Sequence, residues 1–353
     1  MKRALSLLFG LLLLAIPVEA GAAMLRGDAN DDEAVNIADV TTLIDYLLTG
    51  DEAVINVENA EVSGDGQVSI GDVTMLIDYL LSGSWEWDVP HTETFTVNGV
   101  SFTMVIVDGG TFMMGATEEQ GTVDPEDNEY PVHQVTLSSY GIGQTEVTQE
   151  LWEAVWRDFI DTTLMDPEKY LHPSYYCSKN GFSDDPQRPV ENITWTLVDM
   201  FISHLNYITG REFRLPTDAE WEFAARGGNL SRGYKYAGSD NIDEVAWYRE
   251  NAYTAGPDGP VYETHAVATK APNELGIYDM CGNVWEKTSD VYSYVYPSEP
   301  VTNPIYPQMH AGETRSAKGG FYSAPAKYCR VSSRFWDSTS GQRERGLRLA
   351  LTL

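Results

Sequence analysis

Residues 214–228 have the sequence Arg-Leu-Pro-Thr-Asp-Ala-Glu-Trp-Glu-Phe-Ala-Ala-Arg-Gly-Gly, and this stretch decides the fold of the larger part of the chain. Thr217 and Glu220 have the spacing of a capping box, in which two side chains satisfy backbone N–H groups at the start of a helix. The two final glycines are typical of a helix end. The stretch therefore predicts a short helix that runs to Arg226 and buries Trp221.

Other residues of the same stretch are expected in the interior. We expect Arg214 and Arg226, with Arg348 further on, to be buried charge partners of nearby acidic residues, because a buried charge needs a partner. Those acidic residues are Asp218, Glu220 and Glu222. The predicted core residues of this region are Trp221, Phe223, Trp285 and Leu347.

The segments around this stretch predict a mixture of strands and a few helices. Alternating apolar residues indicate strands at 95–97, 102–107 and 132–137. One helix is expected from Thr148, its N-cap, toward Trp156, and a longer helix from about Leu197 to Thr209. Most of the remainder is rich in turns, so the predicted class is α+β.

The N-terminal part contains an internal repeat. Residues 39–50 return at 72–83 with ten of twelve positions identical and an offset of 33 residues. In each copy the apolar residues recur at i, i+3, i+4 and i+7, which predicts one apolar face of a helix. Neither helix can bury this face alone, so the two are expected to pack against each other.

An acidic loop precedes each predicted helix, and its residue types are those that a hard cation such as calcium prefers. Glu61 is longer than the usual aspartate and Ser63 is a neutral ligand, so the second loop is expected to bind more weakly. A solvated acidic loop that only caps a helix is the alternative for both. The candidate ligands are Asp28, Asn30, Asp32, Ala34, Asn36 and Asp39 in the first loop, and Glu61, Ser63, Asp65, Gln67 and Asp72 in the second.

The duplicated loop and helix resemble a type I dockerin domain over about residues 25–83. The resemblance implies a small all-α domain that folds around two calcium ions and docks onto a cohesin domain. Dockerins usually carry a polar pair near loop positions 10 and 11. Here those positions hold Ile37-Ala38 and Ile70-Gly71, so the identity of the cohesin stays open.

A second resemblance covers about residues 100–353. Phe112–Gly115, Glu129–His133, Thr145–Thr148, Arg214–Gly228 and Gly282–Glu286, followed by the phrases at 318–320 and 345–350, are similar to the formylglycine-generating enzyme (sulfatase-modifying factor) family. This implies a C-type-lectin-like fold stabilised by calcium. Asn283 and Glu286 align with a family calcium site, and a hydrogen-bonded turn is the alternative for the pair.

The N-terminus and the net charge bear on localisation. Lys2, Arg3, the apolar run 4–16 and small residues after it predict a secretory signal peptide. We therefore expect a signal peptide at 1–23, a dockerin-like domain at 24–84, a linker at 85–94, a large domain at 95–353, and a secreted or scaffold-attached protein with no transmembrane segment. The net charge of −30 argues against nucleic acid as a partner.

Catalysis in the family depends on cysteine. The resemblance implies two cysteines five positions apart that hold copper, which thiolates bind well as Cu(I). Cys329 is the candidate catalytic residue here, but Ala324 and Arg334 stand five positions away on either side. An iron site held by histidines and a glycosidase carboxylate pair have no positive support. Disulfide pairing among Cys177, Cys281 and Cys329 stays open.

The C-terminal segment is the candidate ligand-binding surface, because large rigid rings bind at low entropic cost. The alternative is that these rings are core or ordinary loop residues. The sequence thus predicts a tethered, non-catalytic module that binds a protein or glycan in an extracellular polysaccharide-degrading assembly. A copper-dependent formylglycine-generating oxidoreductase that acts on a sulfatase cysteine is the alternative. The candidate contact residues are Phe321, Tyr322, Tyr328, Phe335 and Trp336.

Overall fold

The structure is a computed structural model in which the chain divides into two compact units, residues 1–89 and 90–353. It describes residues 27–62 except 33, 52 and 54, then 67–82, 91–123, 128–160, 166–256, 259–305, 314–337 and 341–353. The predicted signal peptide at 1–23 lies outside the described residues. No helix in the described ranges has both the length and the apolar character needed to cross a bilayer.

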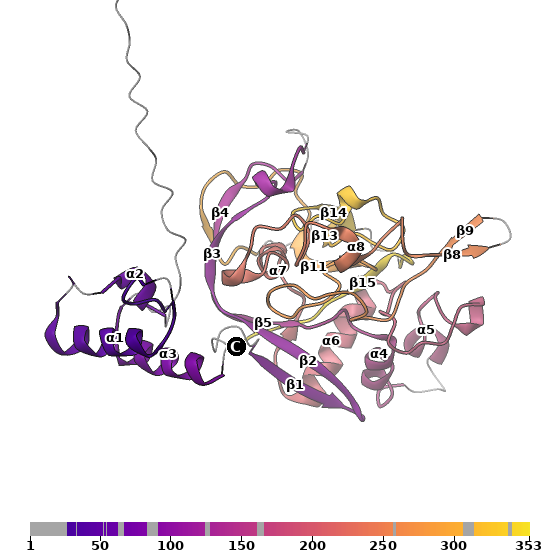
Figure 1. Cartoon of the computed structure of the whole chain (residues 1–353). Helices are drawn as coiled ribbons and strands as arrows, with labels where there is room; N and C mark the ends of the chain where they lie inside the picture. Colours follow the sequence, from indigo (N-terminus) through magenta and orange to yellow (C-terminus); the bar gives the residue numbers. More distant parts are fainter. Residues whose placement is uncertain are drawn as a thin grey trace, which may run out of the picture. The chain divides into compact units, whose positions relative to one another are not determined.

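The first unit is built from helices α1 (Ile37–Thr49), α2 (Val57–Ala60) and α3 (Ile70–Ser82). As the repeat predicts, α1 and α3 pack against each other (Figure 1). Helix α1 ends at Gly50, whose backbone is left-handed with a φ of 69°, a conformation that glycine adopts without strain. The short helix α2 was not predicted. The buried apolar residues of this unit are Ala29, Val40, Leu43, Ala60, Val62, Val73 and Leu76.

The second unit begins with a five-stranded antiparallel sheet in the order β1-β2-β5-β16-β6. Helix α4 contacts this sheet at β1 and β2, helix α6 contacts it at β1 and β6, and the two helices also pack on each other (Figure 1). Thr148 and Thr194 are the N-caps of the two helices, and each accepts a backbone N–H three residues on. The bounds are β1 Thr92–Val97, β2 Val100–Val107, β5 Tyr140–Gly143, β16 Ala350–Leu351, β6 Phe213–Arg214, α4 Gln149–Trp156 and α6 Trp195–Thr209.

A four-stranded sheet of order β14-β13-β11-β15 and a three-stranded sheet of order β12-β4-β3 form the rest of the frame. Helix α7 (Asp218–Ala225) contacts β3, β4, β11 and β13, so the phrase at 214–228 holds the two sheets together. The predicted capping box at Thr217 and Glu220 is present. The strand bounds are β3 Gly110–Met114, β4 His133–Leu137, β11 Trp285–Val291, β12 Val301–Thr302, β13 Arg315–Lys318, β14 Arg334–Asp337 and β15 Arg345–Leu347.

Short elements complete the second unit, which is α+β as predicted. Strand β1 begins at Thr92, inside the stretch predicted as a linker, so regular structure starts earlier than expected. The predicted core residues Trp221, Phe223, Trp285 and Leu347 are all buried. The remaining elements are α5 Pro167–Leu171, α8 Ile242–Val245, β7 Ala246–Trp247, β8 Tyr253–Gly256, β9 Gly259–Tyr262 and β10 Cys281–Gly282.

Candidate functional site

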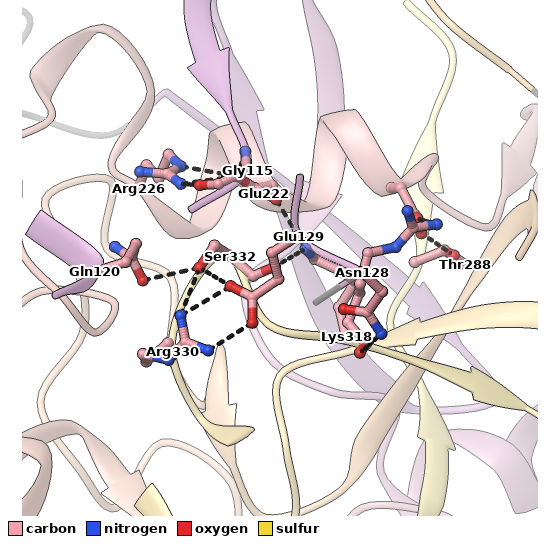
Figure 2. A network of polar contacts seen from close by, with 12 residues as sticks. Gly115, Gln120, Asn128, Glu129, Glu222, Arg226, Thr288, Lys318, Arg330 and Ser332 are labelled. Atoms are coloured by element: carbon pink, nitrogen blue, oxygen red, sulfur yellow. Dashed lines mark hydrogen bonds and ion pairs between the residues drawn. The ribbon is translucent and has the colours of Figure 1, made fainter. Parts of the chain in front are cut away.

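A buried ion cluster links α7 to the C-terminal half of the second unit. Glu222 of α7 is fully buried and accepts hydrogen bonds from Arg226, from Lys318 of β13 at 2.8 Å and from the backbone N–H of Gly115. The cations Lys318 and Arg226 hold the pKa of Glu222 below its usual value despite burial. Figure 2 shows these side chains converging from three segments that are distant in sequence. The cluster therefore holds α7, β13 and the residue that follows β3 together.

A second buried cluster holds the C-terminal segment itself. Arg330 donates to both carboxylate oxygens of Glu129, and the Ser332 hydroxyl contacts Glu129 and Gln120 (Figure 2). Lys318 also donates to the carbonyl of Ser332 at 3.2 Å, which joins this cluster to that of Glu222. These bonds hold residues 330–332 to the interior, so the polar side chains of Arg330 and Ser332 stabilise the fold.

Cys329, the candidate catalytic residue, lies in the apolar core. Its side chain is fully buried, and burial raises the pKa of the thiol well above its usual range. Ala324 and Arg334, five positions away on either side, are also buried. Burial raises the pKa of Cys281 to about 12 as well. The family's copper ion needs two thiolates five positions apart, and Cys329 has no such partner, so the residues present do not fit that copper site.

Aromatic rings of the C-terminal segment form a row with Trp285. The Phe335 ring stacks on Trp285 at 5.7 Å between centroids and on Trp336 at 5.5 Å, and Phe321 lies 6.3 Å from Trp285. The Arg345 guanidinium lies 5.4 Å from the Trp285 and Phe335 rings. Trp336 is 47% exposed, and Phe335 and Phe321 are half-buried. We call Phe321, Trp285, Phe335 and Trp336 the aromatic row.

The prediction for Tyr322 as an exposed contact is wrong. Tyr322 is buried, and the Tyr176 hydroxyl donates to its oxygen at 2.7 Å. Beside this pair, Glu191 is buried and accepts the N–H of Tyr176, and burial raises the pKa of Glu191 to about 8. The Tyr322 side chain is directed inward, where it hydrogen-bonds to Tyr176. Tyr328, by contrast, is 36% exposed at the surface.

Asn283 and Glu286 do not form the predicted calcium site. Trp221 and Arg348 donate hydrogen bonds to both carboxylate oxygens of Glu286. Asn283 donates to Glu146 at 2.7 Å and accepts the N–H of His265. A guanidinium thus supplies the positive charge that an ion would bring, and the hydrogen-bonded alternative is correct. Arg348 therefore pairs with Glu286 and not with the acidic residues of α7.

The first acidic loop gathers several of its predicted ligands. Asp28 and Asp39 are buried, and Asp39 accepts the N–H groups of Asn30 and Asn36. Asp28 accepts the N–H of Asp32, so loop positions 1, 3, 5, 9 and 12 are tied together. Asn36 is the N-cap of α1 and accepts the N–H of Ala38. The hard oxygen donors therefore fit a calcium ion, with Asn36 also serving the helix.

The second loop is described only in part. Ser63 and Asp65 lie outside the described residues. Asp72 is fully buried and accepts the N–H groups of Val62 and Ser69, as Asp39 does for its own loop. Over the ranges that the structure covers, no three acidic, histidine or cysteine side chains are placed as ready metal ligands. The ligands of both loops, including Ala34, Glu61 and Gln67, therefore stay predictions.

Models of two known protein families match parts of this chain. A family model described as "Sulfatase-modifying factor enzyme 1-like domain" matches residues 91–353. The chain belongs to this family. A second model, "Dockerin type I domain", matches residues 26–81, so a dockerin domain precedes the sulfatase-modifying factor-like domain. A dockerin domain implies a cohesin partner and supports calcium binding.

The relatives of the sulfatase-modifying factor-like domain have names that refer to different functions. "Chaperone protein LppX" of Paenibacillus barcinonensis is 31% identical, covering 66% of this chain and 83% of its own length. "Formylglycine-generating enzyme" of Streptomyces coelicolor is 29% identical, covering 66% and 84%. The solved structure of "Treponema denticola variable protein 1" matches with a TM-score of 0.58 and 28% identity, covering 74% and 99%. The C-type-lectin-like fold is therefore shown, whereas the family contains more than one function.

Hydrogen-bond and ion-pair partners that lie far apart in the sequence were not predicted. Glu129 stands in one of the family phrases, but its partner Arg330 does not and lies 201 positions away. His133, in the same phrase as Glu129, is buried with Nδ1 3.2 Å from the Pro131 carbonyl. Charged residues inside the family phrases could have indicated that such long-range ion pairs exist, because buried charges are paired.

Proposed function

We propose that this protein is a non-catalytic binding module that a dockerin domain tethers to a cohesin-bearing scaffold outside the cell. The burial of Cys329, with alanine at position 324, carries the proposal. A buried neutral thiol is a poor nucleophile and a poor copper ligand. The buried polar clusters around residues 330–332 stabilise the fold, and within the described residues no second cysteine stands five positions from Cys329 to complete an oxidase pair.

The aromatic row supports a binding role for the large domain. Trp336 and Phe335 project from β14, which is hydrogen-bonded to β13 and held by the buried ion pair of Arg334 with Asp218. A stiff strand that carries an exposed ring, here Trp336, loses little conformational entropy on binding. The ligand in this proposal is a protein or a glycan of a polysaccharide-degrading assembly.

The dockerin domain supports the tethering role through its exposed apolar residues. Ile37 and Ile70 stand at equivalent positions of the two copies and are 68% and 71% exposed, and Leu48 and Leu81 are 79% and 83% exposed. Large apolar side chains left in solvent on a small domain are typical of a protein-binding surface. In this proposal the cohesin covers them, and two calcium ions hold the loops.

Two assays test the proposal. In the first, the purified protein is incubated under air with copper and a cysteine-bearing sulfatase-type peptide, and mass spectrometry measures conversion to the aldehyde. We expect none. Conversion that is lost in Cys329→Ser would overturn the non-catalytic assignment.

The second assay is a ligand search on protein and glycan arrays. We expect Trp336→Ala to lose at least about tenfold in affinity for a ligand found in this way, which is the usual size of an aromatic hot spot. Tyr207→Ala is the matched control, because Tyr207 is 82% exposed on α6, away from the aromatic row. A ligand whose affinity is equal for all three proteins would place the binding surface elsewhere.

A further inference from the structure

The hairpin of β1 and β2 in the large domain borders a cleft of about 240 Å³. Its turn is Asn98-Gly99, and the φ angles of 48° and 85° are those of the type I′ turn that two-residue hairpins favour. The Asn98 side chain donates to the Ala154 carbonyl at 2.9 Å and to Asp158 at 2.8 Å. The start of β2 is therefore fixed against the end of α4.

The hairpin register sets the direction of the Ser101 main chain. In a two-residue hairpin the residues that flank the turn form a hydrogen-bonded pair, here Val97 and Val100. Hydrogen-bonded and non-bonded pairs alternate along an antiparallel ladder, so the next pair, Thr96 and Ser101, directs its N–H and C=O groups outward from the hairpin. The main-chain groups of Ser101 thus point away from β1.

No strand lies opposite Ser101 on that side. Strand β5 pairs with β2 only from Met104 onward, and the last contact is the N–H of Gln144, which donates to the Thr103 carbonyl at 2.9 Å. The cleft is the gap beyond this bond, with residues 100–104 on one side and 143–148 on the other. Ser101 is exposed, and within the described ranges no group is bonded to its N–H or carbonyl. Such an open strand edge is a template for another extended chain.

The side chains that line the cleft are uncharged except for two glutamates. Glu146 is buried and accepts hydrogen bonds from Asn283 and from the N–H of Val284, whereas Glu150 is only half-buried. The lining contains no lysine or arginine. Apolar side chains cover much of the remainder, and they are Val100, Phe102, Met104, Val147, Leu151, Val267, Ala268 and Leu349.

A second cleft, of about 570 Å³, adjoins the first at Glu150, which lines both. Its two cations, Arg157 and Lys179, each pair with a carboxylate, at 3.3 and 2.9 Å, and the His172 ring lies 4.0 Å from Glu153. Three more carboxylates of this lining have no lysine or arginine within ion-pair distance in the described part of the chain. They are Glu150, Asp184 and Asp185. This excess of negative charge attracts cations.

We propose that the open edge of β2 binds an extended, basic segment of a partner protein. The segment adds a strand at Ser101, packs its apolar side chains on Val147 and Leu151, and directs lysine or arginine side chains toward Glu150 and the second cleft. The first cleft is smaller than the roughly 300–1,000 Å³ of pockets for drug-sized ligands, which favours a short length of main chain. Neither cleft shares a residue with the aromatic row, so this surface is independent of the binding role proposed above.

The test is a titration of the full-length protein with three blocked hexapeptides, followed by NMR. The first alternates lysine and valine, the second is the same peptide with every backbone nitrogen methylated, and the third alternates glutamate and valine. Near saturation the first should slow hydrogen exchange of the Ser101 amide by about tenfold, because that N–H becomes paired.

The other two peptides separate main-chain pairing from charge. The methylated peptide cannot donate to the Ser101 carbonyl and the glutamate peptide meets Glu150, so each should bind at least about fivefold more weakly than the first. Equal binding of the methylated peptide would overturn strand addition. Equal binding of the glutamate peptide would overturn the basic class of partner.

Two proline variants locate the site. Ser101→Pro removes the unpaired N–H and puts the ring in the cleft, at a strand edge where proline is tolerated. It should weaken binding of the lysine–valine peptide by at least about tenfold. Thr96→Pro makes the same change at the opposing residue of the pair, on the edge of β1 outside the cleft, and should leave binding unchanged. Thermal melts check that both variants fold.

A charge variant tests the site without changing the main chain. Glu150→Gln should weaken binding of the lysine–valine peptide by about threefold, whereas Glu118→Gln, at an exposed residue outside both clefts, should have no effect. Binding that is unchanged in folded Ser101→Pro or in Glu150→Gln would overturn the site. Failure of the lysine–valine peptide to bind the wild-type protein at about 10 mM would overturn it as well.

Discussion

Buried carboxylates occur in both units of this protein, and the two units neutralise them differently. In the dockerin domain Asp28, Asp39 and Asp72 receive backbone N–H groups, and residues 27–89 contain no lysine or arginine. In the large domain Glu222, Glu129 and Glu286 each pair with a buried lysine or arginine. Apart from Arg26, the dockerin domain has no lysine or arginine of its own to neutralise these carboxylates, whereas the second unit has a buried cation for each. We therefore expect metal dependence to be confined to the dockerin domain.

The largest expected effect is the response to a chelator. Removing calcium from the full-length protein should unfold the dockerin domain and abolish cohesin binding, because such loops supply folding energy through their ligands. The large domain should keep its melting temperature, which differential scanning calorimetry with and without chelator will show. A lower melting temperature of the large domain after chelation would mean that calcium stabilises this domain as well. That result would contradict the difference between the two units.

A smaller effect is expected from opening the buried ion cluster. Lys318→Met leaves Glu222 with one cation fewer in a fully buried position, which typically costs about 3–5 kcal/mol of the free energy of unfolding. Urea denaturation of the large domain measures this cost. Lys327→Met, at an exposed lysine, is the control and should change stability by less than about 0.5 kcal/mol. A similar loss in both variants would mean that the buried pairing contributes nothing of its own.

The smallest of the three effects concerns pH. Burial raises the pKa of Glu191 to about 8 and that of Asp279 to about 6, while their ordinary values are 4.5 and 3.8. Each group is protonated in the folded state where it is already ionised in the unfolded state. The free energy of unfolding should therefore fall as pH rises from about 4 to about 8, by a few kcal/mol at most.

Glu191→Gln isolates the larger share of this slope. The amide cannot ionise, so the fall in denaturation midpoint between pH 5 and 8 should become smaller, and the remaining pH dependence comes from other shifted groups such as Asp279 and Glu146. Glu118→Gln, at an exposed residue, should keep the wild-type slope. A slope that is unchanged in Glu191→Gln would show that Glu191 ionises normally in the folded protein.

The sequence predicts what local spacing controls. The capping box at Thr217 and Glu220, the N-cap at Thr148 and the helix end at Gly50 are all present, because each depends on neighbours within four positions. Arg214 pairs with Glu220 and Arg226 with Glu222, which are two of the three acidic residues predicted as partners for these arginines.

Long-range partners could not be predicted in this way. Arg348 pairs with Glu286, 62 positions away, and so displaces the calcium expected there. Tyr322 turns inward to Tyr176, 146 positions away, although its neighbours along the chain suggested an exposed segment. A cleft that Arg334 lines has no local motif, since five separate elements, β3, β4, α7, β11 and β14, contribute to it.

The Glu222 cluster constrains how this protein can change over evolution. Glu222 and Glu119 balance the charges of Arg226 and Lys318. Substitution of Glu222, Arg226 or Lys318 alone therefore leaves a net charge in this cluster, so we expect these positions to change together or not at all. Several phrases by which the family is recognised contain these charges. Such phrases are therefore inherited as sets under selection for a neutral interior, and they persist whether or not a descendant retains its ancestor's reaction.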